Sequence, residues 1–440
     1  METAGEAEIV EGLREQQGPG DAEGDFSPRK LKIAAGVLIG QSFATSILPY
    51  SALPLLMIPQ TREFGWSRTE FSWAVTFLFI FGAASLWPIG RLADRIGVRP
   101  VLLGGTAMVG LITLAMSLQT RSLTQFYIYY ALLGIFGSTG VTYMKVVAAL
   151  FTQNRGKAMA ILGAESTVAM SLVPLFTNWL LLSYGWRHLY WVFGSIILAA
   201  VPILFFTLDE PGQRGTAPRW RRQPAQMPAP KPPRLDGMTI REALGDWVFW
   251  MILLAGLPGM FMFNGMLAHM VPAIMAKGFS QTTAAEMISM ATFFGLGGTL
   301  VGGWAVDRFH TARIAVPFCL LAAAGAVLLL VVTAGRGGLA LLAIATGLGG
   351  FTFTAFRPMG TYFQTRFFGL GSFTEIMAVQ YAIANPVTAF AAPIVGYAYD
   401  LTHGYTIAFA MMVGAWLLSA AAWVVLPRYR YAANIGQSPA

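Results

Sequence analysis

Twelve stretches of mostly apolar residues follow one another along this chain of 440 residues and constrain its fold more than any other feature. An α-helix needs roughly 20 apolar residues to cross the hydrocarbon core of a bilayer. The expected spans are Ile33–Ile58, Phe71–Ile89, Val101–Leu118, Gln125–Phe151, Ala158–Leu182, Leu189–Leu208, Trp247–Met275, Met287–Ala305, Ile314–Ala334, Leu339–Phe363, Phe373–Tyr399 and Ile407–Leu426. Charged residues make up only 11 % of the chain, against roughly 25 % in soluble domains. We therefore expect an all-α membrane protein with twelve transmembrane helices.

The distribution of lysine and arginine predicts the orientation in the membrane, because cytoplasmic loops carry an excess of these residues. With the N-terminus placed inside, 21 of the 29 lysines and arginines fall in the tails and inner loops, six in outer loops and two within spans. We expect both termini to be cytoplasmic in the inner membrane of the cell. The chain opens on acidic residues rather than a charged-then-apolar signal, so we expect no cleaved signal peptide.

A segment rich in proline, arginine and glutamine separates the sixth span from the seventh. This composition is typical of a flexible or extended linker. The expected organisation is a disordered cytoplasmic tail at 1–32, a six-helix half at 33–208, a cytoplasmic linker at 209–242, a second six-helix half at 243–427 and a cytoplasmic tail at 428–440.

The two halves repeat each other in sequence. An offset of 213 residues places Gly90, Asp94 and Arg95 on Gly303, Asp307 and Arg308, and an offset of 212 places Lys145 on Arg357. Parallel repeats of six spans are typical of transporters whose substrate path runs between the halves. The sequence therefore predicts two pseudo-symmetric six-helix halves.

The loop after the second span, Gly90 to Arg99 with the sequence GRLADRIGVR, resembles the corresponding loop of the major facilitator superfamily. The second copy differs, since His310 stands where Gly97 does in the first. Other stretches are similar to the bacterial monocarboxylate and oxalate/formate antiporter-like branch: Glu63–Arg68, Arg155–Gly156, Tyr184–Arg187, and Pro393–Asp400 followed by Gly404–Tyr405. Carriers of that branch usually place cations on spans eight or eleven, whereas both spans here lack lysine and arginine in their interiors.

The resemblance covers about residues 30–430 and implies a major facilitator fold, in which these loops latch the halves in one state of the transport cycle. It makes Asp94, Arg95, Asp307 and Arg308 candidate gating residues. The residues of this loop are also compatible with a purely structural function, that of a topological anchor. Gly90 and Gly97 permit a tight reversal, and the arginines anchor it on the cytoplasmic side.

Two basic residues lie within spans, where a charge is costly and therefore a functional candidate. Lys145 is on span four and Arg357 on span ten, and the resemblance implies that spans one, four, seven and ten line the central path. The two cations would then face each other across the pseudo-twofold axis. That arrangement suits a small organic anion such as a mono- or dicarboxylate, because arginine can grip a carboxylate with two parallel hydrogen bonds.

A second interpretation stays open at this point. Spans four and five fold about Arg155, which sets Lys145 and Glu165 at similar depth, and Arg357 and Glu375 are related in the same way. Each half would then hold an internal ion pair that is structural or part of an inner gate. A glutamate released from its cation would gain a raised pKa by burial, which makes Glu165 a candidate for proton coupling.

Uncharged polar side chains on the spans are further candidates for the substrate path. Each one is also the kind of residue that joins membrane helices by hydrogen bonds. His269, near the end of span seven, could simply face water. The candidates for substrate contact are Gln41, Tyr143, Asn264, Gln380 and Asn385.

Several classes of protein are disfavoured by what the sequence lacks. It has no phosphate-binding loop for ATP and no His-Glu-x-x-His cluster, and its one cysteine, Cys319, excludes a cysteine metal site. We expect no enzyme, cofactor or nucleic-acid partner, and a monomer in the lipid bilayer. The sequence favours a transporter of a small organic anion, driven by protons or a counter-anion. The alternatives are an exporter of drugs or other solutes with this fold and, from a different class, a non-transporting carboxylate sensor.

Overall fold

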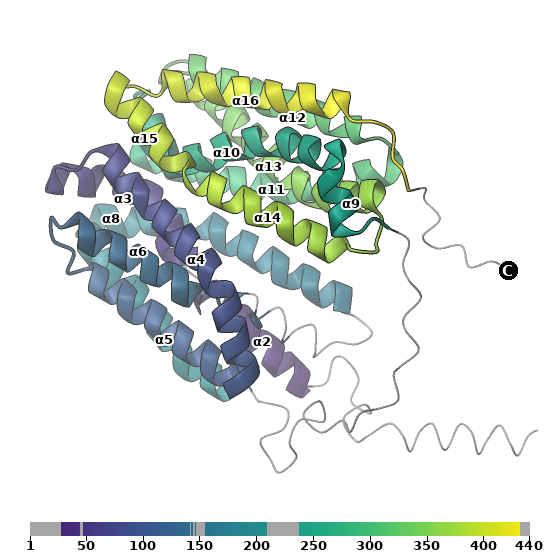
Figure 1. Cartoon of the computed structure of the whole chain (residues 1–440). Helices are drawn as coiled ribbons and strands as arrows, with labels where there is room; N and C mark the ends of the chain where they lie inside the picture. The colour runs from purple at the N-terminus through teal and green to yellow at the C-terminus, as the bar shows by residue number, and fades with distance from the viewer. Residues whose placement is uncertain are drawn as a thin grey trace, which may run out of the picture.

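The computed structural model describes residues 28–44, 47–140, 142–143, 146, 155–208 and 237–431, with the backbone alone at 28–29, 43–44, 47, 155–166 and 169. These residues form two bundles of helices that lie side by side (Figure 1). The N-terminal bundle contains α2 (Pro28–Ala44), α3 (Ile47–Phe64), α4 (Arg68–Ile96), α5 (Val98–Met116), α6 (Leu123–Gly137) and α8 (Arg155–Thr207). The C-terminal bundle contains α9 (Ile240–Gly245), α10 (Trp247–Met275), α11 (Gln281–Arg308), η2 (Ala312–Ile314), α12 (Ala315–Val331), α13 (Gly338–Phe368), α14 (Phe373–Ala389), α15 (Ala391–Thr402) and α16 (Thr406–Val425).

The all-helical membrane fold predicted from the sequence is confirmed. Within the described ranges, nine helical stretches are long and apolar enough to cross a membrane. The expected first span is covered by α2 and α3, on either side of residues 45–46, which lie outside the described ranges, and the fourth is described mainly through the short α6. The expected fifth and sixth spans form the single element α8, which reverses at Gly185 with a φ of 80°. The total of twelve transmembrane helices stays a prediction.

The two bundles share two ends, which we call the linker end and the distal end. The linker end holds the reversal between α4 and α5, the start of α9 and the segment after α16. The distal end holds the connections from α3 to α4, from α10 to α11 and from α15 to α16.

Glycines bring pairs of helices into close contact. A Cβ on Gly298 of α11 would lie 1.9 Å from the carbonyl oxygen of Phe351 on α13, and one on Gly350 would lie 2.0 Å from that of Ala291. In the N-terminal bundle, Gly134 of α6 approaches α4 in the same way. Small residues at such crossings are how membrane helices pack without a hydrophobic driving force. Only glycine fits at these points.

The reversal between α4 and α5 depends on Gly97. This residue has a φ of 101° and is at once the last cap of α4 and the first cap of α5. A side chain would be strained there, so glycine is needed. The predicted role of Gly90 in the reversal is wrong, because Gly90 lies inside α4.

The expected eleventh span is broken into α14 and α15 at Phe390. Pro393 lacks the N–H group that would bond to the carbonyl of Ala389 one turn earlier, so the helical ladder is interrupted there. The freed carbonyl of Ala389 accepts a hydrogen bond of 2.7 Å from the hydroxyl of Thr76 on α4. The hydrogen-bond acceptor freed by the helix break in the C-terminal bundle is thus satisfied by a side chain of the N-terminal bundle.

Candidate functional site

The start of α4 carries the contact between the bundles at the distal end. Ser67 caps this helix, with Glu70 completing a reciprocal capping box. Asp400, on the last turn of α15, accepts hydrogen bonds from the backbone N–H groups of Arg68 and Thr69, at 3.1 and 2.9 Å, and from the Thr69 hydroxyl at 2.5 Å. A carboxylate is favoured at a helix N-terminus, where the peptide dipoles place partial positive charge. One bundle therefore supplies the anion that caps a helix of the other.

The side chain of Arg68 reaches into the C-terminal bundle. Its guanidinium carbon lies 3.7 Å from the centre of the Tyr399 ring, and a guanidinium N–H donates to the hydroxyl of Tyr405. An arginine over an aromatic ring is attracted by the ring's negative face. The contact holds α4 against the turn between α15 and α16.

His269 of α10 lies beneath this contact and is wholly buried. Its Nε2 is 2.9 Å from the Ser72 hydroxyl and 3.0 Å from the carbonyl of Ala392, and its Nδ1 is 3.3 Å from the Tyr405 hydroxyl. Because a carbonyl only accepts, the network assigns the proton to Nε2. The expectation that His269 could face water is wrong, because the docked bundles cover it.

A second polar contact joins the bundles on the other side of the distal end. Asn178 of α8 donates to the hydroxyl of Thr282 at 3.1 Å, and Gln281 of α11 donates to the Asn178 side-chain oxygen at 3.1 Å. Together with Thr76, Asp400 and His269, these side chains close the distal end. We call this set, with Arg68 and Tyr405, the distal latch.

A small cavity of about 30 Å³ lies between the bundles. Its walls come from α3, α8, α10 and α11, and include Tyr50, Ser51 and Thr292. A space of this size holds little more than a water molecule. The path between the bundles is therefore nearly shut where these four helices meet.

Arg357 is exposed and lies on the stripe of α13 that also carries Phe353 and Gln364. Phe353 stacks on Phe263 of α10, and Gln364 donates to Gln380 of α14. Phe263 lies on α10 and Gln380 on α14, and both of these helices contact the N-terminal bundle. Among the described side chains, no carboxylate pairs with Arg357.

Of the two predicted ion pairs, the structure describes both partners only for Arg357 and Glu375. Lys145 lies outside the described residues, and the side chain of Glu165 on α8 does too. Glu375 is exposed in the first turn of α14 and, in the described part of the chain, has no ion pair with Arg357.

The uncharged candidates range from buried to exposed positions. Tyr143 is fully buried in the N-terminal bundle, with its ring against Gly40 and its hydroxyl 3.5 Å from that of Thr106. Asn264 donates at 2.8 Å to the carbonyl of Met260 in its own helix. The others are Gln380, buried against Gln364, Gln41, half-buried on α2, and Asn385, exposed on α14.

The predicted gating residues of the loops lie at the linker end. Asp94 and Arg95 are exposed in the last turn of α4, and Asp307 and Arg308 occupy the equivalent turn of α11. The structure keeps the two pairs at matching positions of the two bundles.

Sequence reasoning missed the distal latch as a site. Of its members, only Arg68, Asp400 and Tyr405 fall within the stretches Glu63–Arg68, Pro393–Asp400 and Gly404–Tyr405, which indicated a family resemblance and no site. The run Ser67-Arg68-Thr69-Glu70 is a capping box and marked the start of a helix. Nothing in the sequence indicated that Asp400 would lie at that start.

Two bundles of membrane-length helices whose sequences repeat each other are typical of membrane transport proteins. The chain belongs to the Major Facilitator Superfamily, whose family model matches residues 35–354. The glycerol-3-phosphate transporter of Bacillus subtilis is 26 % identical over 69 % of this chain and 70 % of its own length. The multidrug resistance protein MdtM of Salmonella typhimurium is 33 % identical over 37 % of this chain and 40 % of its own.

Among solved structures, the fold is similar to that of a bacterial homologue of the human lysosomal transporter Spinster in an inward-facing and occupied conformation. The TM-score is 0.69 at 16 % sequence identity, over 90 % of this chain and 97 % of the other. This likeness confirms the fold.

Proposed function

We propose that this transporter moves a small organic anion by alternating access, driven by protons or by exchange for a counter-anion. The observation that supports the proposal is Arg357, a cation on the stripe of α13 that contacts α10 and α14, with no carboxylate paired to it among the described residues. An unpaired charge at this depth is costly, and an anionic substrate would offset that cost. The similarity to a transporter of glycerol-3-phosphate, an organic anion, agrees with this class.

The distal latch is, in this proposal, the closed gate of one transport state. The N-terminal bundle contributes a helix start and the C-terminal bundle a carboxylate, so separating the bundles would break the contact. Lys145 is proposed as the second cation of the substrate site, and Glu165 as the proton-coupling group. Asp94, Arg95, Asp307 and Arg308 would act in the complementary gate at the linker end.

The proposed orientation places the linker end in the cytoplasm, with both termini and residues 209–242. A cysteine at Ala225, in a Cys319→Ala background, should resist an impermeant maleimide added to intact cells. A matched cysteine at Gly335, in the distal connection before α13, should react. Labelling of the first position from outside would overturn the orientation.

Counterflow in proteoliposomes tests the substrate class. Labelled lactate, oxalate and glycerol-3-phosphate should be exchanged by wild type, and Arg357→Gln should lose this exchange. The rival proposal is an exporter of drugs or other solutes, which the partial likeness to a multidrug resistance protein favours. Uptake of ethidium, with no exchange of any anion, would support the rival.

A further inference from the structure

A cavity of about 460 Å³ opens at the linker end of the C-terminal bundle. Its walls come from residues 310–313 between α11 and α12, from the last turn of α13 and from residues 426–431 after α16. All three segments belong to one bundle, so the cavity is separate from the space between the bundles. It has the size of a small-ligand site.

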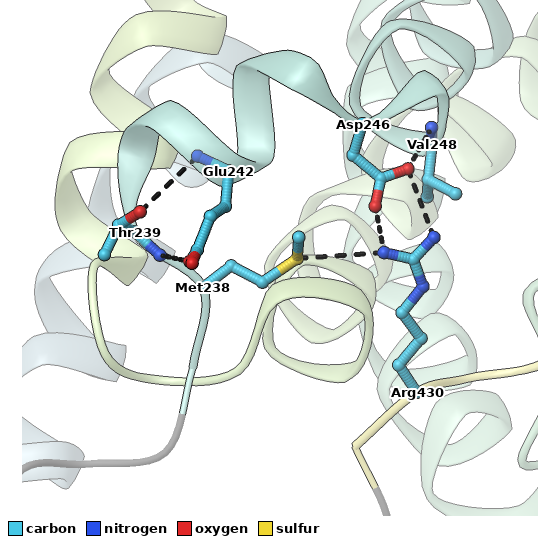
Figure 2. Close-up of polar contacts among 6 residues, drawn as sticks. All are labelled: Met238, Thr239, Glu242, Asp246, Val248 and Arg430. Atoms are coloured by element: carbon cyan, nitrogen blue, oxygen red, sulfur yellow. Dashed lines mark hydrogen bonds and ion pairs between the residues drawn. The ribbon is translucent and has the colours of Figure 1, made fainter.

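The segment after α16 is fixed in place as a wall of this cavity. The backbone N–H groups of Arg430 and Tyr431 both donate to the carbonyl of Arg366, at 3.2 and 3.1 Å. The Arg430 guanidinium binds both carboxylate oxygens of Asp246, which itself caps the start of α10 at Val248 (Figure 2). The cavity is therefore preformed.

The charge of the cavity is positive. Arg313, Arg366 and Arg428 line it, whereas the charge of Arg430 is offset by Asp246. No lining residue is acidic, and none of the three arginines pairs with a carboxylate among the described residues. Three like charges around one space repel each other, and an anion with several oxygens would bind them as arginine binds phosphate.

Other polar groups and the helix dipoles change the electrostatic potential of the cavity, but it stays positive. The lining also contains Tyr429, whose hydroxyl is buried and has no hydrogen-bond partner among the described residues. Thr311 lines the cavity too, and its hydroxyl accepts from the N–H of Arg313 at the start of η2. The C-terminal ends of α13 and α16 bring partial negative charge, about half a unit each. Three full positive charges outweigh them.

The cavity lies at the ends of two helices long and apolar enough to cross a membrane, where lipid headgroups are expected. Arg428 follows the last residue of α16 by three positions, and Arg366 lies in the last turn of α13. We propose that this cavity binds the phosphate group of an anion, carried by an acidic phospholipid or by a soluble phosphate. The site is separate from the transport path and would act on stability or rate rather than on substrate choice.

Binding to delipidated, detergent-purified protein tests the proposal. Native mass spectrometry should show dioleoylphosphatidylglycerol bound more tightly than dioleoylphosphatidylcholine. Arg313→Gln and Arg428→Gln should each weaken phosphatidylglycerol binding about five-fold, the effect of one basic residue near an anionic surface. Arg241→Gln removes an exposed arginine of α9 at the same end and should change nothing.

Inorganic phosphate and glycerol-3-phosphate distinguish the two sources. If either competes with phosphatidylglycerol and binds alone with the same dependence on Arg313 and Arg428, a soluble phosphate is the ligand. If neither competes, the ligand is the lipid. The proposal is overturned if both arginine variants, folded by size-exclusion chromatography, bind every probe as wild type does. Arg313→Lys keeps the charge but loses the planar fork, so it should bind more weakly than wild type and more tightly than Arg313→Gln, which separates loss of charge from misfolding.

Discussion

Asp400 of α15 caps the first turn of α4 at Thr69, so the N-terminus of a helix in one bundle is completed by a carboxylate from the other. The two groups meet across a boundary that must open if substrate is to pass through the distal end. Its strength therefore sets the balance between closed and open states.

Asp400→Asn should open the distal end. Loss of a charged cap costs about 1–2 kcal/mol, which shifts the balance roughly 5- to 30-fold. A cysteine at Thr292, in the small cavity between the bundles, should react correspondingly faster with maleimide in a Cys319→Ala background. Glu63→Gln breaks an ion pair at the same end but within one bundle, and should leave the reaction rate unchanged. An unchanged rate in Asp400→Asn would show that the cap does not hold the gate.

His269→Ala should destabilise the folded protein, because it leaves the buried polar groups around it without their partner. We expect a loss of about 1–3 kcal/mol, measured by thermal unfolding of the purified protein. His269→Gln can still donate a hydrogen bond and should lose less. His188→Ala, at an exposed histidine of α8, provides the matched control. Equal melting temperatures for His269→Ala and wild type would contradict the role of the network.

Glu63 should give the distal end an acid-sensitive component of stability. It lies beyond the expected first span. Burial opposes its ionisation, but hydrogen bonds from Trp186 and Arg187 and the charge of Arg187 outweigh burial, so its pKa lies below the ordinary 4.5. A depressed pKa adds stability above pH 4.5 that is lost as the pH falls through the lower folded value. The difference in melting temperature between wild type and Glu63→Gln should be constant from pH 7 to 5 and shrink below 4.5. A difference that stays constant down to pH 3 would refute this assignment.

Arg357→Gln should weaken substrate affinity at least ten-fold if the side chain contacts the anion. Arg357→Lys should also lose affinity, because the planar fork is lost. Arg336→Gln, at an exposed distal arginine, is the control. If Arg357 instead pairs with Glu375 in another state, Arg357→Ala with Glu375→Ala should recover activity lost in the single variant. The same comparison applies to Lys145 with Glu165. Recovery of activity in both double variants would contradict the anion site and indicate that these ion pairs act only in a gate.

Asp94→Asn should impair transport and leave membrane insertion intact, because the linker-end loops are proposed to act in the cycle. Asp307→Asn, at the equivalent position of the second bundle, should have a smaller effect, since its loop has His310 in place of Gly97. Transport rates in proteoliposomes, normalised to inserted protein, provide the measurement. Normal transport by Asp94→Asn would show that the loop serves only as a topological anchor and has no part in the transport cycle.

The sequence predicted what depends on local composition. Apolar length indicated the spans, because this property is carried by the residues themselves. His269 was misplaced because its burial depends on a partner more than 100 residues away, at Ala392. Asp400 was missed for the same reason. Whether Lys145 and Arg357 share a site stays a prediction.

Proline at 393 has a consequence for how the distal end can open. The Ala389 carbonyl that it frees has the Thr76 hydroxyl as its hydrogen-bond donor while the bundles are docked. When they part, a backbone acceptor is left bare in a largely apolar wall, and such a group is expensive unless water reaches it. Opening and wetting of this gate are therefore a single event, and the speed of the gate depends on how readily the first water molecule enters.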